Sequence, residues 1–400
     1  MKNRVLLLVA LISACTMSCS SSSSPGYTQA DLQAIMETEL QAYSRDKVNY
    51  SGGIAMQILT PWSDYFISSG MGNGMDNSHR FRTASVTKTF TAASIMLLHE
   101  RGQLNINHKL SDNIPGTAIS YFPYAIPHRN EITIKMILMH RAGIFDLTNT
   151  AIRDNAASHG KSYVGKCYID VTMSPPNEEH QFTYDELFSI LANDEQVGFE
   201  PPDSKYDYSD TGYTILAYII ERVAGKSYEA FVRDEFLMPN GLSNTSLPWQ
   251  GTDRTLPPPF VHGYSWDGSA INDVTACNMS GFVGNGNMIT TPLDLATWAK
   301  RLLTGQTALT MSTIDVMKSG LPSGGTSTYG LGILYSPNFG YGHEGDHPGY
   351  STFMYYKPEQ DIAYVVFMNT WDISDWPASY IAQKQFLANT ILKVFIRMGM

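Results

Sequence analysis

The stretch FRTASVTKTFTAASIMLL, residues 81–98, places a serine and a lysine at the start of a long apolar segment. Its apolar residues recur at the spacing of one helical face: Phe90, Ala93, Leu97 and Leu98. This spacing predicts a buried helix. If the helix begins near Ser85, Lys88 lies on the same face, about one turn away. The sequence therefore predicts a hydroxyl and an amine within reach of each other, held rigidly by a packed helix.

The spacing Ser-x-x-Lys is weak evidence by itself, because it occurs three times, beginning at Ser44, Ser85 and Ser158. Ser44 falls at the end of a polar amphipathic segment and Ser158 lies in a loop-like stretch, so only Ser85 opens an apolar helix. Serine is also a favoured helix cap that needs no chemical role. The choice between these two interpretations depends on the rest of the chain.

The composition of the 400-residue chain bounds its class. Hydrophobic residues make up 43% of it and charged residues 16%, which is typical of a soluble globular protein. The net charge of −10 argues against nucleic acid or an anionic membrane surface as a partner, because binding to phosphates requires an excess of Lys and Arg. The chain contains no basic run, and we expect no nucleic-acid partner.

Residues 1–19 have the pattern of an export signal, with a positive start, a short apolar core and small residues after it. The segment resembles a bacterial lipoprotein signal in which Cys15, or alternatively Cys19, is acylated. A plain cleaved signal peptide is the alternative. Residues 20–28 are rich in serine and would form a flexible tether. We therefore expect an exported lipoprotein, periplasmic or at the cell surface, that contacts a membrane only through this anchor.

Segments typical of strands stand near both ends of the chain. A helix is expected at 30–43, strands at 53–59, 65–69, 330–335, 339–345, 350–356 and 362–369, and a closing helix at 378–397. The residues between 104 and 301 are expected to be mostly helical, with Pro- and Gly-rich connections.

These patterns predict an α+β fold of the α/β sandwich type, in which terminal helices flank an antiparallel sheet that a mostly helical insertion interrupts. We expect one domain over residues 29–400. Its sheet lobe would comprise 29–84 and 302–400, and its helical lobe 85–301.

Tyr208 and Asp210 precede an amphipathic helix expected at 215–223. In isolation they are ordinary loop and capping residues. A serine hydroxyl is a weak nucleophile, however, and a nearby phenol or amine is what activates it where no His/Asp pair is present. Tyr208 is therefore a candidate partner of Ser85.

Residues 343–347 match the zinc-protease pattern His-Glu-x-x-His. Two histidines four residues apart share a metal only on a helix. Glycines and a proline surround this pentapeptide, which favours a strand at the edge of the late sheet, where a substrate backbone can approach closely. A zinc peptidase is therefore the disfavoured alternative, and we expect neither metal nor cofactor.

Other motifs point away from common enzyme classes. The chain has no Gly-x-Ser-x-Gly elbow, which counts against an α/β-hydrolase. The glycine-rich loop at 281–286 does not follow a strand in a βαβ unit, so we expect no nucleotide site. His140 is expected to be structural, at a helix end. Whether Cys167 and Cys277 form a disulfide stays open.

Three short motifs occur in a characteristic order: Ser85-x-x-Lys88, Tyr208-x-Asp210 and His343-x-Gly345. Together they resemble the serine β-lactamase and penicillin-binding-protein superfamily, in particular the class C β-lactamase and D-alanyl-D-alanine carboxypeptidase branch. That resemblance implies a β-lactamase/transpeptidase-like fold and a serine hydrolase that forms an acyl-enzyme.

The resemblance also implies roles for single residues. Ser85 would be the acylated nucleophile, and Lys88 and Tyr208 would move its proton, with Tyr208 as the working base. The backbone N–H groups of Ser85 and Asp346, the residue after Gly345, would hold the oxyanion. His343 stands where the family has lysine or histidine, and it would orient the substrate or tune the proton network.

Two residues depart from the family pattern. Asp210 replaces the usual asparagine, and a carboxylate there is expected to raise the pKa of Lys88 and make it a poorer base. Glu344 stands where many relatives have threonine, and its charge is expected to disfavour the carboxylate of a β-lactam or of a D-Ala-D-Ala terminus.

The sequence thus predicts an exported serine hydrolase resembling a D-alanyl-D-alanine carboxypeptidase. Its substrate would be a small peptide, ester or amide, and peptidoglycan fragments that carry D-amino acids are the candidate source. The alternatives are a β-lactamase-family esterase, a true β-lactamase, or a catalytically silent penicillin-binding module.

Overall fold

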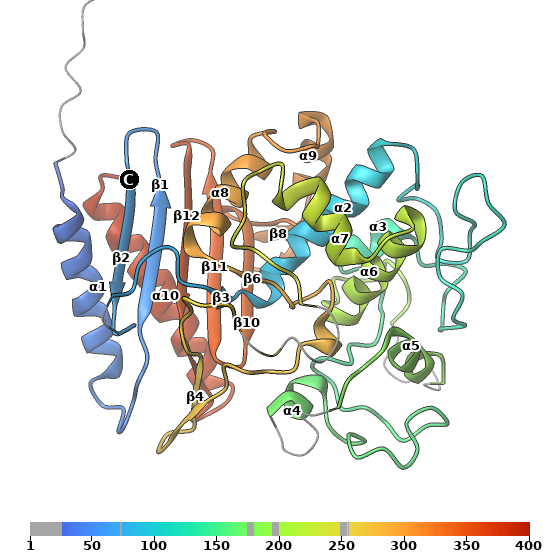
Figure 1. Ribbon diagram of the computed structural model, residues 1–400, viewed down its shortest axis with the longest axis horizontal. Coiled ribbons are helices and arrows are strands. Elements are labelled where there is room, and N and C mark those ends of the chain that lie inside the picture. The colour runs from blue at the N-terminus through green and yellow to red at the C-terminus, as the bar shows by residue number, and fades with distance from the viewer. Residues whose placement is uncertain (1–25, 73, 174–179, 194–199, 249–253, 255) are drawn as a thin grey trace, which may run out of the picture.

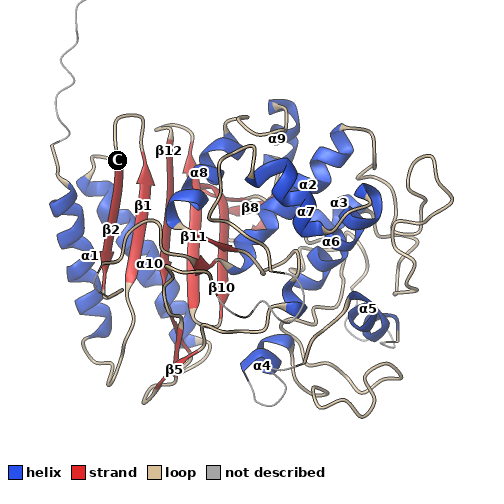
Figure 2. Ribbon diagram, in the orientation of Figure 1, coloured by secondary structure: helices blue, strands red, loops and turns tan. Residues whose placement is uncertain are grey.

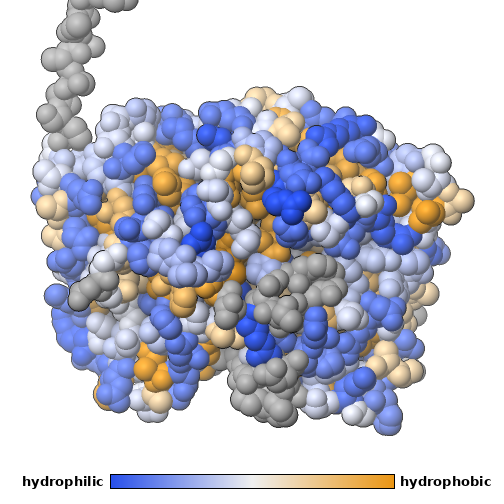
Figure 3. All heavy atoms as spheres, viewed as in Figure 1, coloured by the Kyte–Doolittle hydropathy of each residue, from blue (hydrophilic) through white to orange (hydrophobic). Residues whose placement is uncertain are grey.

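The computed structural model describes residues 26–72, 74–173, 180–193, 200–248, 254 and 256–400 (Figure 1). The expected export segment and residues 20–25 of the expected tether lie outside this part of the chain. Within it, no helix combines the length and the apolar composition needed to cross a membrane. On the face seen in Figure 3, hydrophilic and hydrophobic residues are interspersed. The lipid anchor therefore stays a prediction.

The centre of the fold is an eight-stranded sheet whose strands run antiparallel to their neighbours, in the order β2-β1-β12-β11-β10-β9-β8-β7 (Figure 2). Its strands are β1 Ile54–Leu59, β2 Asp64–Ser69, β7 Leu321–Gly324, β8 Ser327–Tyr329, β9 Leu334–Ser336, β10 Gly340–His347, β11 Tyr350–Lys357 and β12 Ile362–Met368. Because the first hairpin pairs with β12, both ends of the chain contribute to one sheet. The predicted antiparallel sheet is confirmed, although the sequence did not indicate β7 and β8.

Strand β12 shows why this sheet needs cover on both faces, since all of its residues are buried. Tyr364 and Val366 face a core shared with α1 and α10. Val365 and Phe367 face the opposite way, into the larger core. Successive side chains of a strand point to opposite faces, so a continuous apolar run is what a doubly covered strand requires.

Two terminal helices, α1 (Gln29–Ser44) and α10 (Ala378–Arg397), lie side by side on one face of the sheet (Figure 1). A capping box fixes the start of α1. The Thr28 N–H donates to Asp31 Oδ2 at 2.7 Å, and the Asp31 N–H donates to Thr28 Oγ1 at 3.2 Å. The predicted first and closing helices are both confirmed.

The other face of the sheet is covered by α8 (Pro292–Leu303), which packs against β1, β11 and β12. Beyond α8 lie the other helices: α2 Thr87–Glu100, α3 Ile134–Leu138, α4 Tyr168–Met173, α5 Tyr184–Ala192, α6 Asp210–Ala224, α7 Tyr228–Val232, a π-helical turn Arg233–Leu237 and α9 Met311–Lys318. The helix α2 runs through the centre of this group (Figure 1). The division into a sheet lobe and a helical lobe stays a prediction.

The insertion between 104 and 301 is less helical than predicted. Several of its helices are only one or two turns long, and two small sheets lie beside them: β13 (Thr370–Asp372) with β4 (Tyr264–Trp266) and β5 (Ile271–Asp273), and β3 (Phe81–Arg82) with β6 (Ile289–Thr290). Proline-rich connections such as 257–259 explain the difference, because proline cannot continue a helix.

The predicted buried helix is α2, in which every residue from Thr87 to Leu98 is buried. Its polar side chains have partners. Thr89 Oγ1 accepts from Trp298 Nε1 at 2.9 Å, and Thr91 Oγ1 donates to the Gly284 carbonyl at 2.6 Å. Buried polar groups are costly unless they are paired, so these bonds allow a threonine-rich helix to lie in the core. The result is a rigid support for the residues at its N-terminus.

Candidate active site

Ser85 lies in a short 3-10 turn, Ala84–Val86, immediately before α2. The helix therefore begins two residues later than expected. Ala84 has a φ of +50°, in the left-handed region that residues with a side chain rarely occupy. Such strain persists only where the surrounding structure enforces it. Here the turn brings the Ser85 hydroxyl to the surface of a cavity of about 1000 Å³.

Lys88 reaches back from α2 to the serine, as the spacing predicted. Its Nζ donates to Ser85 Oγ at 3.0 Å and to the Asn285 carbonyl at 2.9 Å, and it forms an ion pair with Asp210. The Lys88 side chain is fully buried. Asn285 lies in the glycine-rich loop 281–286. This loop therefore helps to position Lys88.

The pKa of Lys88 is set by two opposing causes, only one of which the sequence indicated. Burial lowers the pKa of Lys88 and is the dominant cause, while Asp210 raises it by a smaller amount. The expected effect of Asp210, a raised pKa of Lys88, is confirmed in direction, but burial outweighs it and the pKa of Lys88 is lowered overall. The sequence contained the carboxylate, but it did not reveal how completely the ammonium is removed from water.

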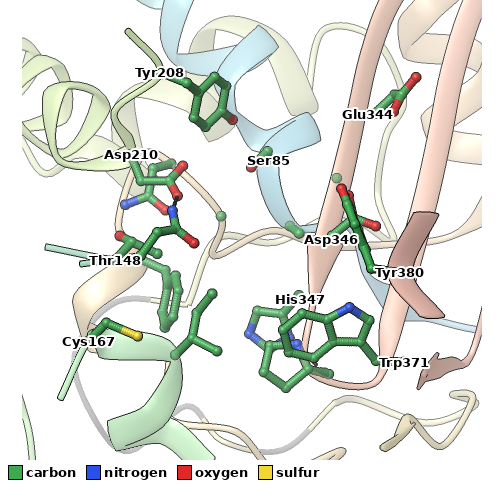
Figure 4. A pocket seen from close by; sticks show the side chains of 18 of the residues that line it. Ser85, Thr148, Cys167, Tyr208, Asp210, Glu344, Asp346, His347, Trp371 and Tyr380 are labelled. Atoms are coloured by element: carbon green, nitrogen blue, oxygen red, sulfur yellow. Dashed lines mark hydrogen bonds between the residues drawn. The ribbon is translucent and has the colours of Figure 1, made fainter. Parts of the chain in front are cut away.

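Tyr208 projects from the segment before α6 toward Ser85 (Figure 4). Burial raises the pKa of Tyr208 well above its ordinary value, and Asp210 raises it further, while a hydrogen bond with the Ser85 side chain acts in the opposite direction. The phenol is therefore neutral at physiological pH. A neutral phenol can donate a proton, so the expectation that Tyr208 is the working base stays a prediction.

His140 holds the segment that carries Tyr208. Its ring stacks on the Tyr208 ring, with centroids 4.0 Å apart and an interplanar angle of 30°. Its Nδ1 accepts from the Ser209 N–H at 3.2 Å, and its carbonyl accepts from the Asp207 N–H at 2.7 Å. Sequence reasoning assigned His140 only a general structural role, since nothing local shows that residues 140 and 208 meet.

Asp210 belongs to a pair of carboxyl groups that the sequence did not connect. Asn149 Nδ2 donates to Asp210 Oδ2 at 3.0 Å and to Asp146 Oδ2 at 2.7 Å. Burial, together with the neighbouring Asp210, raises the pKa of Asp146 to about 7. Two carboxyl groups thus face one buried lysine, and one of them takes up a proton near neutral pH.

Strand β10 passes directly beside the serine. A Cβ added to Gly345 would lie 2.1 Å from the Thr83 carbonyl oxygen and 2.9 Å from the Ser85 nitrogen, so only glycine permits this approach. In the described part of the chain, β9 pairs with β10 only at residues 340–342. In an antiparallel strand, successive residues direct their backbone N–H and C=O groups toward opposite edges of the strand. The peptide of Asp346 therefore faces the unpaired side, next to Ser85.

His343 lies on β10, and both of its ring nitrogens have protein partners. Nε2 lies 2.8 Å from the Tyr329 hydroxyl and Nδ1 lies 2.5 Å from the Glu344 carbonyl. Burial lowers the pKa of His343 to about 3, so the ring is neutral. His343 thus borders the cavity with both ring nitrogens engaged by Tyr329 and the β10 backbone, and its expected role in orienting the substrate or tuning the proton network stays a prediction. These partners fit the tautomer that carries its proton on Nδ1: Nδ1–H donates to the Glu344 carbonyl, and Nε2 accepts from the Tyr329 hydroxyl.

The segment 343–347 is a strand, as predicted, and not the helix that a His-Glu-x-x-His zinc site requires. His347 Nδ1 lies 2.8 Å from the Pro348 carbonyl. The described residues include no group of three or more His, Cys, Asp and Glu side chains placed to hold a metal ion.

Glu344 and Asp346 direct their side chains to the α10 side of β10. Lys384 of α10 forms ion pairs with both, at 3.0 Å from Glu344 Oε2 and 2.9 Å from Asp346 Oδ2. Tyr355 also donates to Glu344 at 2.8 Å. Figure 4 shows Glu344 pointing away from Ser85. Glu344 therefore does not present an unpaired carboxylate to Ser85, although Lys384 is shared with Asp346 and cannot neutralise both carboxylates. The expected repulsion of a substrate carboxylate by Glu344 stays a prediction.

The cavity extends from Ser85 between α4 and the connection that joins β13 to α10 (Figure 4). Cys167 borders it, and burial raises the pKa of this thiol to about 11, so it stays protonated. Cys167 and Cys277 are not joined by a disulfide. The sequence did not indicate the residues of the β13–α10 side: Trp371, Ile373, Trp376 and Tyr380. They follow the last predicted strand, and no motif marks them.

The fold is a β-lactamase/transpeptidase-like α+β fold, with a sheet and flanking helices that position a Ser-x-x-Lys pair beside a tyrosine and a sheet edge. The family described as Beta-lactamase matches residues 48–386. The chain belongs to this family, in its class C-like branch with the penicillin-binding proteins, which confirms the resemblance drawn from the three motifs.

Individual relatives are distant. The chain is similar to penicillin-binding protein 4* of Bacillus subtilis (strain 168), with 27% identity over 293 residues that cover 68% of this chain and 57% of that protein. The chain thus spans less than two thirds of the length of this relative.

Among solved structures, a D-stereospecific amidohydrolase from Streptomyces sp. aligns with a TM-score of 0.71 and 21% identity, covering 90% of this chain and 98% of that one. A D-amino acid amidase from Ochrobactrum anthropi SV3, in complex with L-phenylalanine amide, aligns with a TM-score of 0.71 and 22% identity, covering 92% and 100%. At these identities the structures establish the shared fold.

Proposed function

We propose that this protein is an exported serine hydrolase that cleaves amide or ester bonds of D-amino-acid peptides through an acyl-enzyme on Ser85, in the manner of a D-alanyl-D-alanine carboxypeptidase. The observation that carries the proposal is the 3.0 Å contact between Lys88 Nζ and Ser85 Oγ at the start of a helix that is buried from Thr87 to Leu98. A buried amine in contact with a serine hydroxyl is one of the arrangements that activate this weak nucleophile.

Acylation begins from the uncharged form of Lys88: Ser85 Oγ attacks the carbonyl carbon of the scissile bond, and the free amine of Lys88 accepts the hydroxyl proton. Burial of Lys88 favours this step, because it lowers the pKa of the ammonium. As the bond to the leaving amine or alkoxide breaks, the neutral phenol of Tyr208 gives that group a proton. The proton that Lys88 took from Ser85 then passes to Tyr208 and restores its phenol. The acyl group stays on Ser85 as an ester until water hydrolyses it.

The tetrahedral intermediate carries an oxyanion, for which the N–H groups of Ser85 and Asp346 are the proposed donors. The close approach of Gly345 to the Ser85 nitrogen supports this assignment, because it brings the two peptides to the same place. Fixed backbone donors of this kind stabilise charge that develops in the transition state.

The proposed substrate class rests on the family and on two named relatives, a D-stereospecific amidohydrolase and a D-amino acid amidase, that share the fold. β-Lactam hydrolysis is the second candidate. The direction of the Glu344 side chain favours this candidate, because it points away from Ser85 and is paired with Lys384. Export and lipidation at Cys15 or Cys19 complete the proposal and rest on residues 1–19 alone.

The test is intact-mass analysis of the protein after incubation with a fluorophosphonate and, separately, with a fluorescent penicillin. We expect one adduct that maps to Ser85 and is absent from Ser85→Ala. The substrate panel pairs a D-amino acid amide with its L-enantiomer, and includes a peptide ending in D-Ala-D-Ala, a simple ester and a penicillin. We expect turnover of the D-amide or the D-Ala-D-Ala peptide in preference to the L-amide.

Each other outcome contradicts a specific part of the proposal. An adduct on Ser85 without turnover of any substrate would indicate a binding module and not an enzyme. Turnover that persists in Ser85→Ala and disappears with a chelator would support a zinc peptidase. Faster hydrolysis of penicillin than of every peptide and amide would replace the carboxypeptidase-like activity with a β-lactamase.

A further inference from the structure

One side of the active-site cavity is formed by three aromatic side chains from the end of the chain. Trp371 of β13, Trp376 of the following connection and Tyr380 of α10 border the same cavity as Ser85. The rings of Trp371 and Trp376 have centroids 5.6 Å apart, and those of Trp376 and Tyr380 have centroids 5.0 Å apart. We call these three residues the aromatic wall.

The aromatic wall is fixed from behind and open toward the cavity. Trp371 is 6% exposed, and the Tyr380 hydroxyl donates to Asp346 Oδ2 at 2.9 Å. Trp376, which rests on both, remains 55% exposed. A large apolar side chain left half exposed on a rigid support beside a cavity is typical of a surface that contacts a ligand.

The position of the aromatic wall relative to Ser85 indicates which part of a substrate it meets. In Figure 4, Tyr208 lies on one side of Ser85, and Asp346, Tyr380 and Trp371 lie on the other. In the proposed mechanism Tyr208 gives a proton to the leaving group, which must therefore lie on the Tyr208 side. The acyl group then extends in the opposite direction, past Asp346 toward the aromatic wall.

The polarity of the aromatic wall limits the chemistry of that acyl group. The Trp371 Nε1 atom is buried and has no hydrogen-bond partner among the residues that the structure describes, and the Tyr380 hydroxyl is already engaged by Asp346. Neither group therefore offers a hydrogen bond to a ligand in the cavity. Ile373 and Pro348 add further apolar surface on the same side. A sugar ring would lose hydrogen bonds to water here, whereas an aromatic ring would gain edge-to-face and stacking contacts.

We propose that the aromatic wall is a specificity subsite that binds an aromatic ring on the acyl group of the substrate, the part that becomes attached to Ser85. This inference rests on the proposed acyl-enzyme function and adds the chemical class of its acyl group. Trp376 is the central residue of the subsite, because its exposed ring faces the cavity while Trp371 and Tyr380 hold it in place.

The experiment compares two esters with the same leaving group, 4-nitrophenyl phenylacetate and 4-nitrophenyl acetate. We expect Trp376→Ala to lower kcat/KM for the phenylacetate about tenfold and to change that for the acetate by less than twofold, while Trp376→Phe retains most of the preference. Trp62→Ala is the matched control, since Trp62 is 54% exposed but lies outside the cavity lining. It should alter neither ester.

The outcomes separate this inference from the proposed function. If fluorophosphonate labels Ser85 and both esters are hydrolysed, but Trp376→Ala lowers their kcat/KM equally, the aromatic subsite is wrong and the acyl-enzyme stands. If a sugar-bearing acyl group depends on Trp376 more than phenylacetyl does, the assigned class is wrong. If Ser85 is neither labelled nor acylated by any ester, the proposed function fails, and the subsite fails with it.

Discussion

The imidazole of His140 lies against the phenol of Tyr208 while its Nδ1 accepts the backbone N–H of the next residue, Ser209. One side chain thus fixes both the ring and the main chain of the segment that carries Tyr208. His140 also has a φ of +53°, so the bend at the end of α3 places this ring where the two segments meet.

We expect His140→Ala to lower the acylation rate of Ser85 about tenfold or more, because it leaves the buried Ser209 N–H without a partner, at a cost of roughly 1–3 kcal/mol, and removes the stacking contact. His140→Asn, which retains an acceptor, and His140→Phe, which retains a ring, should each recover part of the rate. Stopped-flow labelling with fluorophosphonate measures this. An unchanged rate in a folded His140→Ala would show that Tyr208 does not depend on His140.

Replacing Asp210 by Asn should preserve acylation and change its pH dependence. The Asp210 carboxylate raises the pKa of Lys88 against the larger lowering by burial. Without that carboxylate the pKa of Lys88 falls further, so the rise of kcat/KM with pH should move to lower pH, by roughly one to three units. A pH profile of acylation in both proteins tests this. Complete loss of acylation, or a shift to higher pH, would show that the carboxylate has a direct chemical role.

Asp146→Asn should reduce the loss of stability that the parent protein shows as the pH rises from acid to neutral. The pKa of Asp146 is about 7 in the folded protein, against an ordinary value of 3.8. The folded state therefore binds more protons than the unfolded state between about pH 4 and pH 7, so stability falls as pH rises through this window. A pKa difference of this size changes the free energy of unfolding by at most ~4 kcal/mol across the window. We expect the Asp146 contribution to be at least about 1 kcal/mol.

Urea unfolding of both proteins at pH 5 and pH 8 measures this effect. The free energy of unfolding of Asp146→Asn should change less between the two pH values than that of the parent protein. The same pH dependence in both would mean that Asp146 is ionised in the fold throughout this range.

Gly345→Ala should disrupt the site more than its small volume suggests. The added Cβ would lie 2.1 Å from the Thr83 carbonyl oxygen, and a backbone atom cannot move aside cheaply. We expect the acylation rate to fall at least about 100-fold, since loss of one oxyanion donor has an effect of this order. Gly286→Ala is the matched control beside Ala84, because its Cβ would make only ordinary contacts, the nearest at 3.6 Å.

Gly286→Ala should fold and acylate within a few-fold of the parent protein. Comparable acylation by Gly345→Ala and Gly286→Ala would show that β10 need not lie so close to Ser85.

The extent of sequence-based prediction can be seen in α10 and β12. Their patterns are local, with one apolar stripe at helical spacing and one continuous apolar run, and both were located almost to the residue. Strand β7 was missed because it is short, mostly exposed and carries a proline and a glycine. Its pairing with β8 is decided by the sheet beside it, and its own residues give little signal.

The same distinction applies to the site. Motif order was enough to bring Ser85, Lys88 and Tyr208 together as candidates. The direction of Glu344 was not predictable, because the face to which a strand residue points depends on register, and one residue of shift reverses it. Burial lowers the pKa of Lys88 and raises the pKa of Tyr208. A sequence motif does not show how completely either side chain is buried.

Because the sheet is assembled from both ends of the chain, the components of the reactive centre are scattered along it. The alcohol of Ser85 comes from the first quarter of the sequence, the phenol of Tyr208 from its middle, and the peptide of Asp346 from its last sixth. A growing chain that has not yet produced β10 carries the serine without the strand it lies against. Reactivity therefore emerges only with the finished fold, and labelling of Ser85 would report how many molecules have completed it.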